Sequence, residues 1–299
     1  MADPAILYCV GATKAGTSWL YRTLHDHPEC HLRAVKEAHY WDTFDAATRT
    51  RQTAAFNHRL VEFQTARDAA QAQGIGWKVA NLNRRINDMT ALIAVVAGDR
   101  QGDKAYRDWL CDGVGDRRLV ADMTPNYATL PDNTFARMAR LGPVTRFVYL
   151  IRDPLARLWS HVRMQAERQR QPHEAFEQKA TNILTRILNR GQETHILERG
   201  DYPATVARLR RTIPADALRV EYCERLFTED GLRDMSAFLG LTYHAANGAA
   251  PAHEGPKATL DAGLAAKAVA FLKEHYDWAA GEIGPLPAAW QDNLARIAA

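Results

Sequence analysis

The sequence predicts an α/β fold in which helices flank a central parallel β-sheet. Four apolar runs have the character of buried strands, and they lie at residues 6–10, 119–121, 146–151 and 218–222. Such runs are typical of strands that are covered on both faces. Helical patterns lie between or after them, and strands that alternate with helices favour a parallel sheet. We therefore expect a single domain over residues 1–299.

The helical patterns follow the strands in order. Leu20 and Leu24 share one face of a first helix, which we expect to end at Pro28. Residues 155–162 and 264–272 repeat this pattern with leucine, valine and phenylalanine. Residues 48–112 differ, because they are rich in Arg, Gln and Ala and contain helical stretches at 60–73 and 86–96. We interpret this region as a helical excursion from the sheet that covers a substrate cleft.

The composition narrows the classes of function. The chain has 299 residues, of which 46% are apolar, and its 38 Lys plus Arg against 35 Asp plus Glu leave a net charge of +3. These values are typical of a globular protein and argue against a disordered chain. They also argue against a nucleic-acid partner, because such proteins usually carry a large basic excess. Any anion site must therefore be a local cluster.

The sequence also bears on the compartment. The first ten residues, MADPAILYCV, lack the pattern of a signal peptide, and no run is apolar enough for a membrane span. The four cysteines lie far apart and form no CxxC pair, which indicates reduced thiols. We expect a cytoplasmic protein.

A glycine-bearing loop follows the first predicted strand. Residues 11–18 read GATKAGTS, and a helix begins there. Glycines let the backbone curl so that N–H groups point inward, and a helix N-terminus adds unsatisfied donors and partial positive charge. Lys14 adds a full charge, and Thr17 and Ser18 add hydroxyl donors. The pattern predicts an anion site, with a tight turn and a solvated lysine as the alternative.

This loop differs from a nucleoside-triphosphate loop, in which Lys directly precedes the Ser/Thr that binds magnesium. Here Lys14 stands three residues before Thr17, and Gly16 fills the lysine position. The loop therefore suits a phosphate ligand but lacks the arrangement that recruits the metal. A P-loop kinase or nucleotide hydrolase remains one alternative function, and a non-catalytic binder of anionic ligands is another.

The run at 146–151 leads into a second predicted anion site. Arg152 stands at its carboxyl end, where open α/β sheets bind ligands. Asp153 is a good N-cap and Pro154 fits the first helical position. Ser160 follows Arg157 by three residues, so the two are expected to share a face. Arg152 and Ser160 are suited to grip a phosphate, and the alternative is a capped helix whose arginines are only solvated.

Together these segments resemble the two signatures of sulfotransferases that use 3′-phosphoadenosine-5′-phosphosulfate (PAPS). GATKAGTSWL, residues 11–20, resembles the 5′-phosphosulfate loop, and RDPLARLWS, residues 152–160, resembles the 3′-phosphate motif. Their order along the chain also agrees with that family. Weaker similarities lie at residues 124–127 (TPNY), 200–202 (GDY), 221–227 and 238–241 (FLGL). The resemblance spans most of the chain outside the region after Thr48.

The resemblance implies a P-loop-like α/β fold and transfer of a sulfuryl group to a hydroxyl or amine of a small-molecule or carbohydrate acceptor. The product nucleotide would be 3′-phosphoadenosine-5′-phosphate (PAP), and no metal is expected. Lys14 would stabilise the leaving phosphate. The implied nucleotide contacts are Lys14, Ala15, Gly16, Thr17, Ser18, Trp19, Arg152, Ser160 and, in a loosely matching loop at 253–257, Lys257.

The candidate general base lies in KEAHYWD, residues 36–42. In an extended chain Glu37 and His39 project to the same side. The segment resembles the Lys-Glu-Pro-His-Phe/Tyr motif of the glycosaminoglycan-type branch, with Ala38 in place of proline. That resemblance implies Glu37 as the base, with His39 and Asp42 orienting it or contacting the acceptor. His39 remains the alternative base, as in the cytosolic small-molecule branch, and a plain surface pair of Glu37 with Lys36 is the non-functional alternative.

Residues outside these motifs allow three weaker expectations. Related glycan enzymes often have Glu-Lys where this chain has Asp122-Met123, so a basic residue is missing there. A histidine and cysteine cluster matches no standard zinc spacing, and it comprises His25, His27, Cys30 and His31. Four aromatic residues are candidates for the acceptor pocket or for the core, namely Trp41, Trp77, Trp109 and Tyr127.

Overall fold

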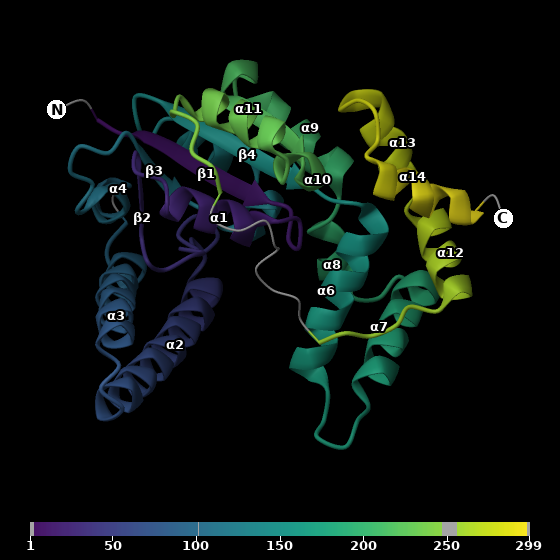
Figure 1. The fold of residues 1–299 in the computed structure, drawn as a ribbon, viewed down its shortest axis with the longest axis horizontal. Helices are drawn as coiled ribbons and strands as arrows, with labels where there is room; N and C mark the ends of the chain where they lie inside the picture. The colour runs from purple at the N-terminus through teal and green to yellow at the C-terminus, as the bar shows by residue number, and fades with distance from the viewer. Residues whose placement is uncertain (1–2, 101, 247–255, 298–299) are drawn as a thin grey trace.

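The computed structural model describes residues 3–100, 102–246 and 256–297. One sheet of five strands runs through its centre in the order β2-β3-β1-β4-β5 (Figure 1). All neighbouring strands are parallel. The strands are β1 (Ala5–Gly11), β2 (Cys30–Leu32), β3 (Leu119–Asp122), β4 (Thr145–Ile151) and β5 (Leu218–Tyr222). The predicted parallel α/β fold is confirmed, and the short strand β2 is an addition to it.

The central position of β1 determines where the two predicted anion motifs meet. In the register Tyr8 pairs with Asp122 on one side and with Phe147 on the other. The carboxyl ends of β1 and β4 are therefore neighbours at one edge of the sheet. Because the glycine-bearing loop follows β1 and Arg152 follows β4, the two motifs come together.

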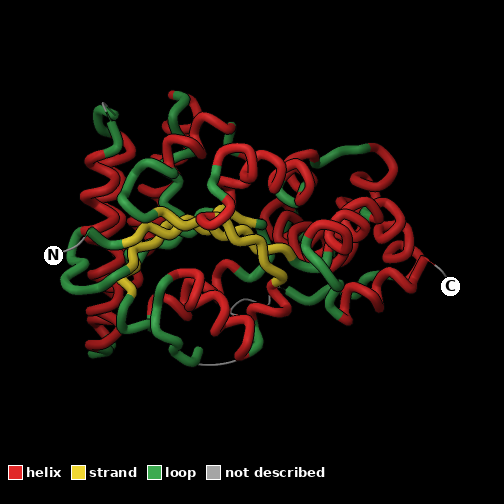
Figure 2. The backbone as a smooth tube through the Cα atoms, turned by 90° about the horizontal axis from the view of Figure 1, so that it is seen from above, coloured by secondary structure: helices red, strands yellow, loops and turns green. Residues whose placement is uncertain are grey.

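Helices cover both faces of the sheet (Figure 2). Helices around it include α1 (Thr17–His25), α5 (Asp132–Met138), α9 (Tyr202–Thr212), α10 (Cys223–Leu226) and α11 (Glu229–Leu239). Leu20 and Leu24 are buried on α1 as predicted, and the helix ends at His25, before Pro28. Short 3-10 turns are η1 (Pro125–Thr129), η2 (Ala215–Ala217) and η3 (Ala295–Ile297).

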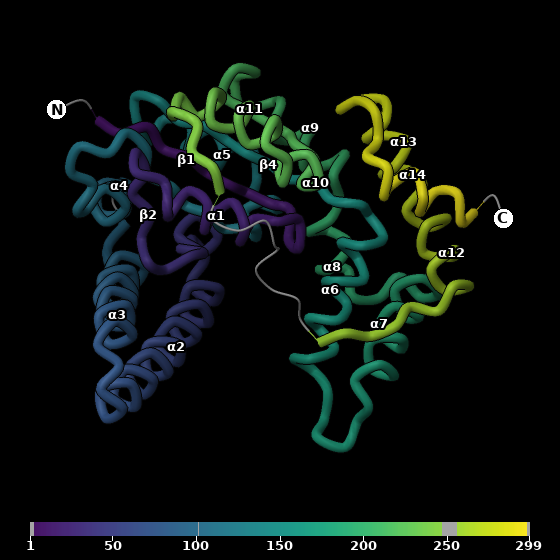
Figure 3. Tube along the Cα trace, in the orientation of Figure 1, coloured from purple at the N-terminus to yellow at the C-terminus, as the bar shows by residue number. Residues whose placement is uncertain are grey.

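The region predicted as a helical excursion is a helical hairpin. It consists of α2 (Ala46–Ala72) and α3 (Gly76–Ala97), and α4 (Lys104–Cys111) leads back to the sheet. The two long helices pack against each other and project away from the sheet (Figure 3). Phe56, Met89 and Leu92 are buried between hairpin and core. Trp77, near the tip, is 77% exposed.

The other helices form a group beside the carboxyl ends of β4 and β5. It contains α6 (Pro154–Gln169), α7 (Phe176–Arg190), α8 (Thr194–Glu198), α12 (Ala262–Phe271), α13 (Lys273–Glu282) and α14 (Ala288–Leu294). The single apolar face predicted over 264–272 is wrong, because the chain turns at Leu272 between two helices and leaves Phe271 46% exposed. Within the described ranges, no helix combines the length and apolar character that a membrane crossing requires.

Candidate active site

The loop between β1 and α1 forms one wall of the main cavity. Gly16 has φ 89° there, a left-handed conformation that favours glycine. A Cβ atom at Gly16 would also lie only 3.1 Å from Cζ of Phe227. Lys14 has φ 71° although it carries a side chain. This backbone path brings Thr17 and Ser18 to the cavity wall at the start of α1, where first-turn N–H groups lack intrahelical partners.

Lys14 and Arg152 belong to one cluster of positive charge. Nη1 of Arg152 donates a hydrogen bond to the carbonyl oxygen of Lys14 at 3.2 Å. The pKa of Lys14 lies below its ordinary value, because the ammonium is partly buried and because Arg152, Arg163 and other cations lie nearby. The structure thus joins the two motifs that the sequence placed 138 residues apart. An anion between them would relieve the repulsion.

Helix α6 supplies the second wall of the cavity. Asp153 caps the helix, since its Oδ1 accepts a hydrogen bond from the backbone N–H of Ala156 at 2.7 Å. The cavity-lining positions of the helix recur every fourth residue, and they are Ala156, Ser160, Met164 and Arg168. Ser160 therefore faces the cavity together with Arg152, as predicted.

The expected pairing of Arg157 with Ser160 on this face is wrong. Arg157 is not a cavity-lining residue and is only 2% exposed. Its Nη2 donates to the carbonyl oxygen of Ile196 at 3.4 Å, behind the helix. The cavity follows the i, i+4 row of α6, so a residue three positions from Ser160 turns toward the core.

Both predicted anion motifs and the predicted base line one cavity of about 650 Å³. Lys14, Gly16, Thr17, Ser18 and Trp19 come from the first motif, and Arg152 and Ser160 come from the second. Glu37 and His39 line the same space. In the described part of the chain, none of the lining residues comes from the α2–α3 hairpin. Ala15 and Asp42 lie behind the wall rather than in it.

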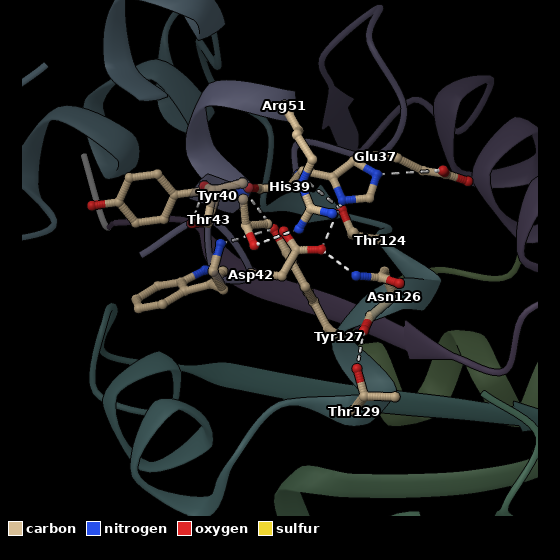
Figure 4. A network of polar contacts seen from close by, with 12 residues as sticks. Glu37, His39, Tyr40, Asp42, Thr43, Arg51, Thr124, Asn126, Tyr127 and Thr129 are labelled. Carbon is tan, nitrogen blue, oxygen red and sulfur yellow. Dashed lines mark hydrogen bonds and ion pairs between the residues drawn. The ribbon is translucent and has the colours of Figure 1, made fainter. Parts of the chain in front are cut away.

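The segment with the candidate base lacks regular secondary structure. Glu37 has φ 69° and His39 has φ 50°, both left-handed. Oε1 of Glu37 accepts a hydrogen bond from Nζ of Lys36 at 2.7 Å, and its Oε2 lies 3.8 Å from Nε2 of His39. Nδ1 of His39 lies 2.8 Å from Oδ2 of Asp42 (Figure 4). Strained backbone of this kind persists where the surrounding structure holds it, often at functional sites.

The charges of this segment determine its protonation. Partial burial would raise the pKa of Glu37, but His39 and the ammonium of Lys36 outweigh that effect and hold this pKa well below its ordinary value. Burial would likewise lower the pKa of His39, but Asp42 and Glu37 raise it to about 9. At neutral pH the Glu37 carboxylate is therefore ionised and the His39 imidazole is protonated.

A second segment holds the candidate base in place. Nδ2 of Asn126 donates to Oδ2 of Asp42 at 2.5 Å, and the hydroxyl of Tyr127 accepts from the backbone N–H of Tyr40 at 2.9 Å (Figure 4). The Tyr127 hydroxyl in turn donates to Oδ2 of Asp122 at 2.8 Å. Asp122, at the end of β3, is fully buried and also accepts from the hydroxyl of Tyr106 at 2.6 Å. Asp122 thus anchors the wall of the site.

Several cavity residues escaped the sequence-based prediction. Lys36 lies between the loop after β1 and Glu37, since its Nζ also donates to Oγ1 of Thr17 at 3.4 Å. Oε2 of Glu224 is buried and has no hydrogen-bond partner among the described residues. The other unpredicted lining residues include Arg168, Arg199, Phe227, Ala289 and Asn293. Lys36 could have been predicted to line the cavity because it directly precedes Glu37. Arg199 and Asn293 could not, because they stand outside the two motifs.

The structure does not place the aromatic candidates in the cavity. Trp41, Trp109 and Tyr127 are buried in the core, and Trp77 is exposed on the hairpin. Lys257 is exposed, and it is not one of the residues that line the cavity. The preceding part of its loop, at 253–255, lies outside the described residues.

The histidine and cysteine residues near the end of α1 do not form a cluster. Nε2 of His27 lies 2.9 Å from the carbonyl oxygen of Thr242, and Nε2 of His31 lies 2.8 Å from that of Asp112. Cys30 is a buried thiol in β2. Across the described ranges, no group of three or more His, Cys, Asp or Glu side chains is arranged to hold a metal ion.

The fold and sequence are similar to those of known sulfotransferases. Residues 5–244 match the sequence profile of the sulfotransferase family. A sulfotransferase from Alicyclobacillus acidocaldarius has a similar fold, with a TM-score of 0.60 and 20% identity over 97% of this chain and 100% of that chain. No curated protein matches the sequence.

Two further solved structures are less similar. The sulfotransferase domain from the curacin biosynthetic pathway has a TM-score of 0.44 and 15% identity over 100% of this chain and 99% of that chain. The sulfotransferase domain from the Synechococcus PCC 7002 olefin synthase has a TM-score of 0.41 and 15% identity over 82% of this chain and 76% of that chain.

Proposed function

The chain belongs to the sulfotransferase family, and from this premise we propose that it transfers a sulfuryl group from PAPS to a hydroxyl or amine of a small-molecule or carbohydrate acceptor. One observation carries the proposal. A single cavity holds two anion motifs on one side, with Arg152 hydrogen-bonded to the loop of Lys14, and a carboxylate–imidazole pair on the other. Donor and acceptor can therefore meet in one space.

The donor side suits a nucleotide with phosphate groups at both ends. Lys14 and the N-terminus of α1 are suited to the 5′-phosphosulfate, and Arg152 with Ser160 is suited to the 3′-phosphate. The rings of Trp19 and Phe227 pack edge-on with centroids 5.0 Å apart, and they offer an apolar surface for the adenine ring of the nucleotide. A cavity of about 650 Å³ lies in the usual range for such ligands.

In the proposed reaction the acceptor oxygen forms a bond to sulfur while the bond from sulfur to the bridging oxygen of the 5′-phosphate breaks. The proton of the acceptor hydroxyl passes to Glu37. The negative charge that develops on the bridging oxygen is stabilised by the ammonium of Lys14. The products are the sulfated acceptor and PAP.

The protonation of the pair supports Glu37 rather than His39 as the base. A general base must have a free lone pair, and the Glu37 carboxylate has one at neutral pH. With a pKa of about 9, His39 is protonated there and donates instead of accepting. His39 and Asp42 then orient the carboxylate, while Lys36 connects it to Thr17 of the donor loop.

Isothermal titration calorimetry with PAP tests the donor side of this proposal. We expect binding without added magnesium. Incubation with PAPS and mixed pools of alcohols, phenols and amines should release PAP, whereas ATP with magnesium should not be hydrolysed. Absence of PAP binding, or magnesium-dependent ATP turnover, would overturn the proposed function.

A further inference from the structure

An arginine that lines the cavity, Arg199, has no assigned task. Arg199 lines the same cavity as Glu37, His39 and Asn126. It is half-buried, and it forms no hydrogen bond or ion pair with any residue that the structure describes. Partly buried guanidinium groups are usually paired with an acceptor. Arg199 therefore offers its donors to a ligand.

The turn that carries Arg199 packs against the buried side chain of Arg157. Arg199 caps the C-terminus of α8, and Gly200 follows it. A Cβ atom at Gly200 would lie 2.1 Å from Cζ of Arg157, so only glycine allows the buried guanidinium to pack there. Nη2 of Arg157 also donates to the carbonyl oxygen of Ile196 at 3.4 Å, within α8.

The same turn is tied to the donor side. The hydroxyl of Tyr202 donates to the carbonyl oxygen of Arg152 at 2.6 Å and accepts from its backbone N–H at 3.3 Å. The backbone turn that carries Arg199 is thus held near the proposed 3′-phosphate site.

The charges around Arg199 do not cancel. Lys36 pairs with Glu37, and His39 pairs with Asp42, so that segment is close to neutral. Arg199 adds a further positive charge. Burial lowers the pKa of Arg199, the nearby carboxylates of Asp42 and Glu37 oppose that shift, and neither lies within ion-pair distance. An anion that bound here would gain from a partly desolvated cation.

We propose that Arg199 binds an anionic group of the acceptor, either a carboxylate or a phosphate ester, so that the preferred acceptors are anionic alcohols or phenols. A guanidinium presents a planar fork of donors that matches both groups. Glu37, which lines the same cavity, then reaches the hydroxyl of the bound molecule. This inference rests on the proposed function.

The test compares anionic acceptors with neutral counterparts, which for the carboxylates have nearly the same shape. The carboxylate pairs are β-hydroxybutyrate, β-hydroxyoctanoate and para-hydroxybenzoate, each against its amide, and the phosphate pair is glycerol phosphate against glycerol. Release of PAP from PAPS gives kcat and KM. For one of the two classes, we expect kcat/KM to be at least about tenfold higher for the anionic members than for their neutral counterparts. This factor corresponds to the free energy of one charge-assisted hydrogen bond.

The variant Arg199→Gln should remove this preference by raising KM for the anionic members at least about tenfold, while the neutral members change less than about threefold. Arg199→Lys keeps the charge and should retain part of the preference. Arg190→Ala, which removes an exposed arginine from the end of α7, is the matched control and should behave as the wild type.

Four results would overturn the inference. The first is an equal loss for neutral and anionic acceptors in Arg199→Gln, with a shifted pH profile, which would indicate an effect on Glu37 alone. The second is weaker PAP binding in that variant, which would place Arg199 on the donor side. The third is a preference of the wild type for neutral acceptors. The fourth is intact PAP binding by a protein that uses none of the anionic acceptors.

A protein that fails to bind PAP at all would instead contradict the proposed function.

Discussion

The two sides of the cavity are held in place in different ways. On the donor side the residues stand at the ends of regular elements, with Thr17 at the start of α1 and Arg152 directly after β4. On the acceptor side residues 36–42 form neither helix nor strand. Glu37 and His39 have positive φ angles of 69° and 50° there. The segment is held by hydrogen bonds of Asp42 with His39 and with Asn126.

This difference has an energetic consequence. A residue with a side chain in the left-handed region costs about 1–3 kcal/mol. The hydrogen bonds from Asp122 through Tyr127 to the backbone of Tyr40 offset that cost. The donor side also has one such residue, Lys14 with φ 71°, but its loop follows a central strand of the sheet, which the whole core stabilises. Substitutions in the acceptor-side network should therefore change turnover while nucleotide binding persists, whereas substitutions on the donor side should weaken nucleotide binding.

The largest expected effect is that of Glu37→Gln. This change removes the proton acceptor but keeps an oxygen for the hydrogen bond from Lys36. We expect kcat to fall about 10²–10⁴-fold, with PAP affinity nearly unchanged by calorimetry. If the variant turned over PAPS at the wild-type rate, Glu37 would not be the base.

The next effect is that of Arg152→Ala on the donor side. Loss of a charge-assisted hydrogen bond to phosphate should weaken PAP binding about 10–100-fold in calorimetry. Arg190→Ala, outside the cavity, should leave the affinity unchanged. Equal PAP affinity in Arg152→Ala and the wild type would place the 3′-phosphate elsewhere.

A smaller effect is expected for Tyr127→Phe, which removes one hydroxyl from the acceptor-side network. Asp122 and the backbone N–H of Tyr40 then lose a buried partner, so the free energy of unfolding should fall by about 1–3 kcal/mol in urea titrations. We also expect a lower kcat with unchanged PAP affinity. Tyr21→Phe, which removes a hydroxyl bonded to the carbonyl oxygen of Arg33 outside the cavity, should lower stability without affecting kcat. A loss of PAP affinity in Tyr127→Phe would contradict the separation of the two sides.

The smallest effect concerns pH. The pKa of His39 is raised from 6.5 to about 9 by Asp42 and Glu37, which outweigh the effect of burial. The protonated form is the one that the fold stabilises, so this contribution is complete below pH 6.5 and is lost as the pH rises through about 9. The stability difference between the wild type and His39→Gln should therefore shrink over that range in urea titrations. Parallel curves for the two proteins would show that His39 is not held in its charged form.

The fold was predictable to the extent that it depends on local pattern. The four apolar runs correspond to β1, β3, β4 and β5, and the helical region after Thr48 is present. Strand β2 is only three residues long and has His31 at its centre, so it does not stand out as an apolar run. The face of Arg157 was misjudged, because helical spacing alone does not tell which side of α6 meets the cavity.

The donor side was determined by the sequence itself. A strand, a curled loop and a helix N-terminus are consecutive in the chain, so local residue types such as Gly16, Asp153 and Pro154 specify their geometry. Parallel strands then bring Lys14 and Arg152 to one edge. Their hydrogen bond depends on β1 and β4 being neighbours, and this strand order is known only from the structure.

Only the tertiary structure decided the acceptor side. Asp42 meets Asn126 from 84 residues away, and Tyr40 meets Tyr127 from 87 residues away. Arg199 reaches the cavity because Arg157 and Tyr202 hold its turn. No local pattern encodes these contacts, since each arises where irregular segments pack on a finished sheet. The same packing leaves Arg199 without a partner among the residues that the structure describes, and therefore available to an acceptor.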